Sequence, residues 1–167
     1  MNRASLRTIA GFTLIELVVL LLVASILLVT IIGVWPSTTP MTLNAAAQTV
    51  KSDLQFAQAR AFNYNQSLTI TFSSTGYTIS NNTGPSVFFP GTGNSQSATV
   101  GLPSGITLST TGLTSNILDF DHSGVPWTGV WSSGPTMLTV AAQITLTRSG
   151  ISQSLSVIPQ TGAVLDG

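Results

Sequence analysis

Hydrophobic positions follow three successive patterns along this chain. The first is a continuous apolar run over residues 17–35, without a single charged residue. At about 1.5 Å per helical residue the run would extend roughly 29 Å, close to the roughly 30 Å hydrocarbon core of a bilayer. It therefore predicts a membrane-spanning helix near the amino terminus.

The second pattern is a helical stripe. Pro36 and Pro40 should break or kink the first helix. Apolar residues then recur every three or four positions, at Leu43, Ala47, Val50, Leu54, Ala57 and Ala61. We expect a helix over about residues 42–63 whose stripe packs against the domain's own sheet.

The third pattern has a period of two, which is typical of strands. Residues 67–72 and 77–80 alternate around a turn and predict a hairpin. Shorter strands are expected near 86–89, 98–102, 106–109 and 116–120, and a longer pair at 137–147 and 151–158 is joined by Arg148-Ser149-Gly150. The order predicts an α+β fold, a long amino-terminal helix followed by an antiparallel β-sandwich or open barrel. Val87-Phe88-Phe89-Pro90 could be an edge strand packed in the core or an exposed apolar patch for a partner subunit. Trp127 and Trp131, in a glycine-rich loop, could anchor an interface or cover the end of the sandwich.

Composition narrows the function classes. The chain has 167 residues, no cysteine, 6% charged residues and a net charge of zero. After the apolar run about 130 residues remain, enough for one domain with its own core. Disulfides are excluded, and no basic or acidic field would recruit a polyelectrolyte.

One acid interrupts the apolar pattern. Gly11-Phe12-Thr13-Leu14-Ile15-Glu16 leads into the run, and the segment itself offers no counter-charge for Glu16. A charge in a membrane segment costs about 2.5–3.5 kcal/mol at the bilayer centre, less near an edge, so it indicates a function. A secretory signal peptide would be shorter and end in a small-residue cleavage site. A plain anchor would explain the length of the run but not Glu16.

These residues resemble the start of type IV pilins and type II secretion pseudopilins. The resemblance implies that a prepilin peptidase cuts between Gly11 and Phe12 and methylates the amine of Phe12. It also implies that Glu16 meets the terminal amine of a neighbouring subunit. Opposite unit charges 4 Å apart gain about 4 kcal/mol at an effective dielectric constant of about 20, so such a pair could set the register between subunits.

Three further segments resemble the GspH/FimT branch of these proteins: residues 54–61, 117–124 and 154–162. The branch implies a minor pseudopilin of a type II secretion pseudopilus, with its counterpart in a type IV pilus as the alternative. The expected parts are a leader (1–11), a transmembrane assembly helix (12–35), its kinked continuation on the sheet (36–63) and a periplasmic β-sandwich domain (64–167). Arg3 and Arg7 favour a single pass through the inner membrane with the domain in the periplasm. A monomeric membrane-anchored binding domain is the remaining alternative.

Candidate chemistry is sparse. Residues 119–124, Asp-Phe-Asp-His-Ser-Gly, resemble the first half of an EF-hand loop, but Val130 occupies the twelfth position; Asp119 and Asp121 are therefore weak metal candidates. The single histidine, His122, and the lack of cysteine give no catalytic or zinc constellation, so we expect no enzyme and no cofactor. DNA-binding members of the branch carry arginine where this chain has Ala163, which argues against nucleic acid as a partner. The expected partners are other pilin-like subunits, the prepilin peptidase, the inner membrane and exported proteins.

Overall fold

The computed structural model describes residues 12–32, 39–81, 97–130 and 134–167, and only the backbone of residues 27–32. The chain divides into two compact units, Met1–Ser37 and Thr38–Gly167. The first contains helix α1 (Leu14–Ile32). Among the residues described, no helix is both long enough and apolar enough to be identified as crossing a membrane.

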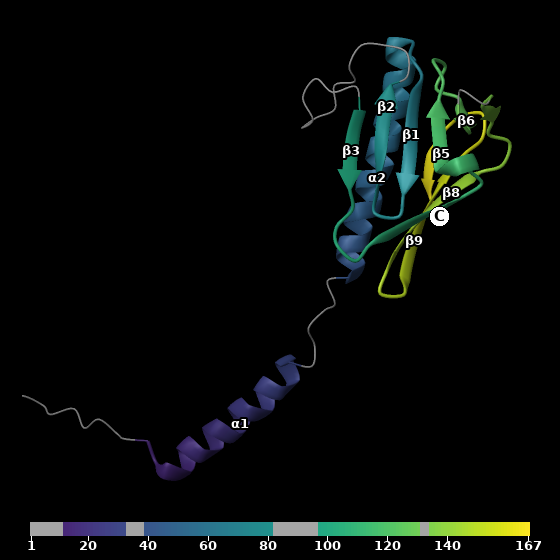
Figure 1. Ribbon diagram of the computed structural model, residues 1–167. Helices are drawn as coiled ribbons and strands as arrows, with labels where there is room; N and C mark the ends of the chain where they lie inside the picture. Colours follow the sequence, from purple (N-terminus) through teal and green to yellow (C-terminus); the bar gives the residue numbers. More distant parts are fainter. Residues whose placement is uncertain (1–11, 33–38, 82–96, 131–133) are drawn as a thin grey trace, which may run out of the picture. The chain divides into compact units, whose positions relative to one another are not determined.

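The described part of the second unit combines one α-helix with two antiparallel sheets (Figure 1). Helix α2 (Thr39–Tyr64) opens it. One sheet has the strand order β3-β2-β1-β5-β6-β7 and the other β10-β9-β8-β4. The strands are β1 (Leu68–Ser73), β2 (Gly76–Asn81), β3 (Ser97–Gly101), β4 (Thr107–Thr111), β5 (Ile117–Phe120), β6 (Pro126–Thr128), β7 (Thr136–Met137), β8 (Ala142–Arg148), β9 (Ile151–Val157) and β10 (Val164–Asp166). The predicted α+β class is confirmed.

Helix α2 supplies the centre of the core. Every residue of the predicted stripe is buried, and Ala46 joins it. The helix begins three residues before the predicted start, so Pro40 lies in its first turn, where a missing backbone N–H costs no intrahelical bond. Both sheets contribute buried side chains to the same cluster, among them Ile70, Phe120, Ile144 and Leu155.

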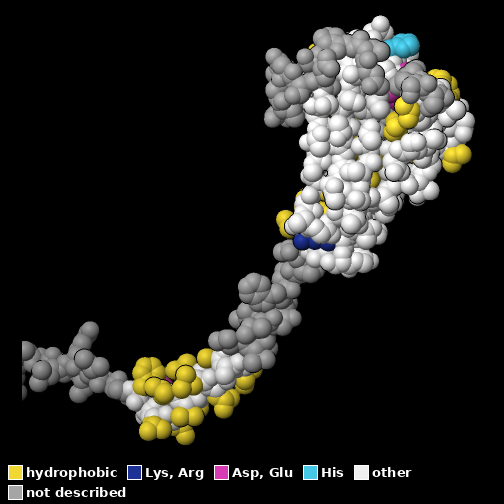
Figure 2. Space-filling model, in the orientation of Figure 1, with side chains coloured by type: hydrophobic (Ala, Val, Ile, Leu, Met, Phe, Trp, Pro, Cys, Tyr) yellow, Lys and Arg dark blue, Asp and Glu magenta, His cyan; other side chains and the backbone are white. Residues whose placement is uncertain are grey.

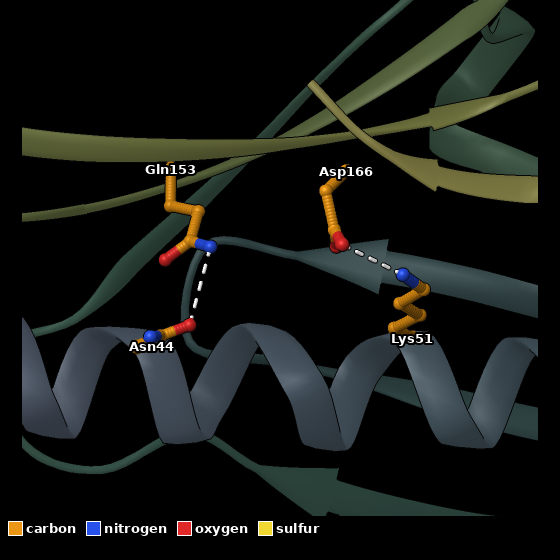
Figure 3. A network of polar contacts seen from close by, with 4 residues as sticks. All are labelled: Asn44, Lys51, Gln153 and Asp166. Carbon is orange, nitrogen blue, oxygen red and sulfur yellow. Dashed lines mark hydrogen bonds and ion pairs between the residues drawn. The ribbon is translucent and has the colours of Figure 1, made fainter.

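Polar contacts fix α2 against the second sheet. Lys51 Nζ lies 2.8 Å from Asp166 Oδ2 in β10, and Gln153 Nε2 in β9 donates to Asn44 Oδ1 at 3.3 Å (Figure 3). Because both contacts join one helix to adjacent strands, they fix its position along the sheet.

Most strands lie where alternation predicted them, but three differences are informative. The predicted strand over 137–147 is wrong at its start, because β8 begins at Ala142 while Met137 lies in β7 and pairs with Trp127 of β6. Strand β6 occupies what we interpreted as a loop, and β10 was not predicted. These strands are only two or three residues long, too short for a period of two to be recognised. The strand expected at 86–89 falls outside the described residues.

Candidate functional site

The first candidate site is the start of α1, where Glu16 lies in the first turn. The Glu16 backbone N–H donates to Thr13 Oγ1 at 3.4 Å. Thr-x-x-Glu is the order of a capping box, and an acid in the first turn also interacts favourably with the helix dipole. The sequence alone marks Glu16 as an acid without a counter-charge and, by resemblance, as an assembly residue; the structure adds the capping contact.

Around Glu16 the helix is uncovered by its own chain. The exposed fractions are 71% for Phe12, 84% for Leu14 and 74% for Ile15, and Glu16 is itself exposed. Within the described residues no ion pair includes Glu16; Gly11, Arg3 and Arg7 are not among them. Figure 2 shows hydrophobic side chains covering the described part of this helix. A surface of this kind suits lipid or other subunits better than water.

The second candidate site brings together the three GspH/FimT-like segments. Gln58, on α2, donates through Nε2 to Gly124 O at 2.9 Å and to Thr161 O at 2.6 Å. One amide therefore joins the helix, the turn after β5 and the turn between β9 and β10. We call this arrangement the Gln58 junction. The sequence showed the three segments separately, but it gave no signal that they meet.

Asp121 shapes the first of these turns. Its Oδ1 accepts the backbone N–H groups of Ser123 at 2.8 Å and Val125 at 2.9 Å, and its Oδ2 accepts the indole N–H of Trp127 at 3.2 Å. A carboxylate that accepts two local N–H groups stabilises a tight turn. Trp127 is half-buried and covers this turn, which agrees with the packing alternative for that residue; Trp131 lies outside the described residues.

Gly162 completes the junction through close approach. Its φ is +68°, and a Cβ there would lie 2.4 Å from Gln58 Nε2 and 2.8 Å from Gly124 O. Any side chain would therefore both strain the backbone and displace the amide. Close packing thus explains why glycine occupies position 162, after Thr161, in the turn between β9 and β10.

Asp119 is buried between strands. Its Oδ1 accepts the Ser67 hydroxyl at 2.7 Å and its Oδ2 the Thr69 hydroxyl at 2.5 Å, across the register pair Thr69 and Asp119. Asp119 and Asp121 therefore serve different local networks. No group of three or more His, Cys, Asp or Glu side chains suited to a metal occurs in the described part of the chain.

A hydrogen bond between a buried tyrosine and a partly buried aspartate joins α2 to the first sheet. The Tyr77 hydroxyl, on β2, donates to Asp53 Oδ2 at 2.5 Å, and Tyr77 is 1% exposed. Burial, followed by the hydrogen bond to Asp53 and its negative charge, raises the pKa of Tyr77 well above its usual range. The neutral phenol is therefore favoured in the folded domain.

The Lys and Arg side chains of the second unit do not form one patch. Lys51 pairs with Asp166, the Arg60 guanidinium lies 4.4 Å from the Tyr64 ring centroid, and Arg148 donates to Thr42 Oγ1. Ala163 is exposed without a cation beside it in sequence. Since phosphate contacts by clustered cations provide most non-specific affinity for DNA, this arrangement offers little to a nucleic acid.

A shallow groove of about 290 Å³ lies beside the Gln58 junction. Its lining includes Gln58, Ala59, Phe62 and Gly124, and the Phe62 ring is 65% exposed. An exposed aromatic side chain beside a groove is a kind of residue that often anchors contacts with another protein chain.

An exposed apolar helix, followed by a helix packed on two antiparallel sheets, defines a pilin-like protein. The sequence profile of the family described as type II transport protein GspH matches residues 46–162, so the chain belongs to the GspH family. No curated protein sequence matches it.

Two solved structures share the fold. The type IV minor pilin FimU of Pseudomonas aeruginosa is 16% identical with a TM-score of 0.53, over 79% of this chain and 92% of that one. The minor pseudopilin EpsH from the type 2 secretion system of Vibrio cholerae is 13% identical with a TM-score of 0.52, over 75% and 95%. At these identities the likeness is one of fold.

Proposed function

We propose that this chain is a minor pseudopilin subunit of a type II secretion pseudopilus. The observation that carries the proposal is the GspH match over residues 46–162, which spans most of α2 and every described strand except β10. The similarity to EpsH supports the same assignment. The role is structural, with no catalytic step.

Assembly begins at the amino terminus. The prepilin peptidase removes residues 1–11 by cutting between Gly11 and Phe12 and methylates the new amine, and residues 12–35 remain in the inner membrane. Glu16 then pairs with the amine of a neighbouring subunit. Support comes from the uncharged run of residues 17–35 and from the exposed apolar surface around Glu16. An ion pair at 4 Å would contribute about 4 kcal/mol at an effective dielectric constant of about 20.

The rest of the chain provides specific contacts in the periplasm. Residues 36–63 carry the sheets of residues 64–167, which contact other pseudopilins or exported proteins. The groove at the Gln58 junction, with its exposed Phe62, is the surface we assign to such a contact.

A minor pilin of a type IV pilus is the second candidate. It is favoured by the similarity to FimU, whose TM-score of 0.53 is close to the 0.52 of EpsH. Both candidates share the amino-terminal features, so only phenotype separates them.

The test is the protein content of culture supernatant from a strain deleted for this chain, compared with its parent. A secretion subunit predicts that specific exported proteins disappear from the supernatant and accumulate in the periplasm, and that a plasmid copy restores them. An unchanged supernatant with lost surface filaments or lost DNA uptake would favour the type IV pilus.

A further inference from the structure

One end of the second unit combines the start of α2 with the turn between β8 and β9. Figure 1 shows this hairpin projecting at the end of the unit where α2 begins. The Arg148 guanidinium, at the end of β8, donates to Thr42 Oγ1 in the first turns of α2, which joins the two elements.

This end presents a cation among apolar side chains. Met41 is 79% exposed and Ile151 is 43% exposed, and both are close in sequence to the Thr42–Arg148 contact. Basic side chains are visible at this end in Figure 2. The segments that form it, residues 39–45, 102–107 and 147–152, contain no Asp or Glu. We call Met41, Arg148 and Ile151 the proximal surface.

The short segment between α1 and α2 limits how far the proximal surface can lie from the end of α1. Six residues, 33–38, separate Ile32 at the end of α1 from Thr39 at the start of α2. At no more than about 3.6 Å per residue they span about 25 Å at most. If α1 lies in a bilayer, as the proposed function requires, the proximal surface lies within reach of the lipid headgroups.

We propose that the proximal surface docks on anionic phospholipid headgroups of the membrane that holds α1, before the subunit joins a filament. A guanidinium has five N–H donors, so Arg148 can contact a lipid phosphate while it keeps its bond to Thr42. Met41 and Ile151 enter the interfacial layer beside it. One basic residue near an anionic surface contributes little by itself, but the tether makes the contact intramolecular and gives it a high effective concentration.

The absence of cysteine in the sequence makes the test direct. The full chain is reconstituted into vesicles of phosphatidylcholine with or without phosphatidylglycerol, with a fluorophore on a single introduced cysteine. Ile151→Cys reports the proximal surface. Val140→Cys is the matched control, because Val140 is 70% exposed and precedes the opposite end of β8, about 20 Å away along the strand. Ser25→Cys reports whether α1 is inserted.

Lipids carrying a quencher near the headgroup should quench the label at residue 151 in anionic vesicles and leave the label at residue 140 unchanged. Arg148→Gln should lower the docked fraction relative to the undocked one by about fivefold, the effect of one basic residue at an anionic surface. Arg148→Lys should keep most of it, because charge rather than the bond to Thr42 holds the lipid.

Two outcomes would overturn the proposal. Equal quenching at residues 151 and 140, with the label at residue 25 inside the bilayer, would reject docking and leave the membrane helix standing. Equal loss in Arg148→Lys and Arg148→Gln would assign Arg148 to the fold alone. A label at residue 25 that stays accessible to water would instead reject the proposed membrane helix.

Discussion

Helices α1 and α2 differ in where their apolar side chains lie. Helix α2 buries its apolar stripe and is joined to the sheets through Lys51, Asp53 and Gln58. Helix α1 exposes large apolar side chains along its described length, from Leu14 to Ile26. An apolar stripe that the chain buries is explained by the fold, whereas apolar side chains that the chain leaves exposed indicate a contact with lipid or with another protein. The exposed apolar side chains of α1 therefore point to function more directly than the packed helix α2 does.

We expect the largest effect at Glu16, in the exposed helix. Glu16→Ala should reduce complementation of a deletion strain to the level of the empty vector, because the subunit loses its pair with a neighbouring amine. Cleavage after Gly11, measured as the size shift of the precursor, should stay normal. Glu16→Asp should retain part of the function. Full complementation by Glu16→Ala would reject the assembly role and favour a capping role alone.

Shortening one leucine in each helix tests the same difference through stability. Leu54 is 0% exposed and Leu20 is 55% exposed. Leu54→Ala should lower the free energy of unfolding by about 2–5 kcal/mol through a cavity in the core, whereas Leu20→Ala should change it by less than about 0.5 kcal/mol. Urea unfolding of the full chain in detergent measures both. Equal losses would mean that α1 belongs to the folded core.

A smaller effect is expected at the Gln58 junction. Gly162→Ala should cost about 2–4 kcal/mol, because the new methyl group meets Gln58 and Gly124 in a left-handed backbone conformation. Gly150→Ala is the control, since its φ of +80° is similar but nothing lies within 4 Å of the added Cβ; it should cost only about 1–2 kcal/mol. Thermal unfolding measures both variants. Similar losses of unfolding free energy in the two would show that the junction is loosely packed.

The smallest effect concerns pH. Because the folded-state pKa of Tyr77 is raised above its ordinary value of 10.0, its contribution to stability is complete below about pH 10 and declines as pH rises further, where the unfolded chain loses the proton first. Tyr77→Phe should cost about 1 kcal/mol near neutral pH by removing the bond to Asp53, and should flatten the decline above pH 10. Urea midpoints at pH 8 and pH 10.5 give the comparison. An unchanged slope in Tyr77→Phe would contradict it.

Sequence periodicity predicted α2, the first hairpin and the β8–β9 pair, because each is long enough for its period to repeat. It could not place β6, β7 and β10, whose few residues pair through tertiary context. Among site residues, Glu16 was selected as a candidate because a lone acid in an apolar run is costly, and its role in assembly stays a prediction. Gln58 was not, since a polar residue on a helix has the same pattern whether it faces solvent or joins two distant turns.

Most charged groups of the second unit are already engaged within the chain: Asp119 and Asp121 by hydroxyl or N–H donors, Lys51 by Asp166, and Arg60 by an aromatic ring. The unit also has only three Lys or Arg residues against four Asp residues, so its net charge is small. Such a domain projects little long-range field, and encounters between subunits should proceed without electrostatic steering, at about 10⁵–10⁶ M⁻¹s⁻¹ in solution. If α1 lies in a membrane, as we propose, confinement to the plane of that membrane becomes the main factor that speeds encounters between subunits. Salt should change the rate of assembly far less than the surface density of subunits does.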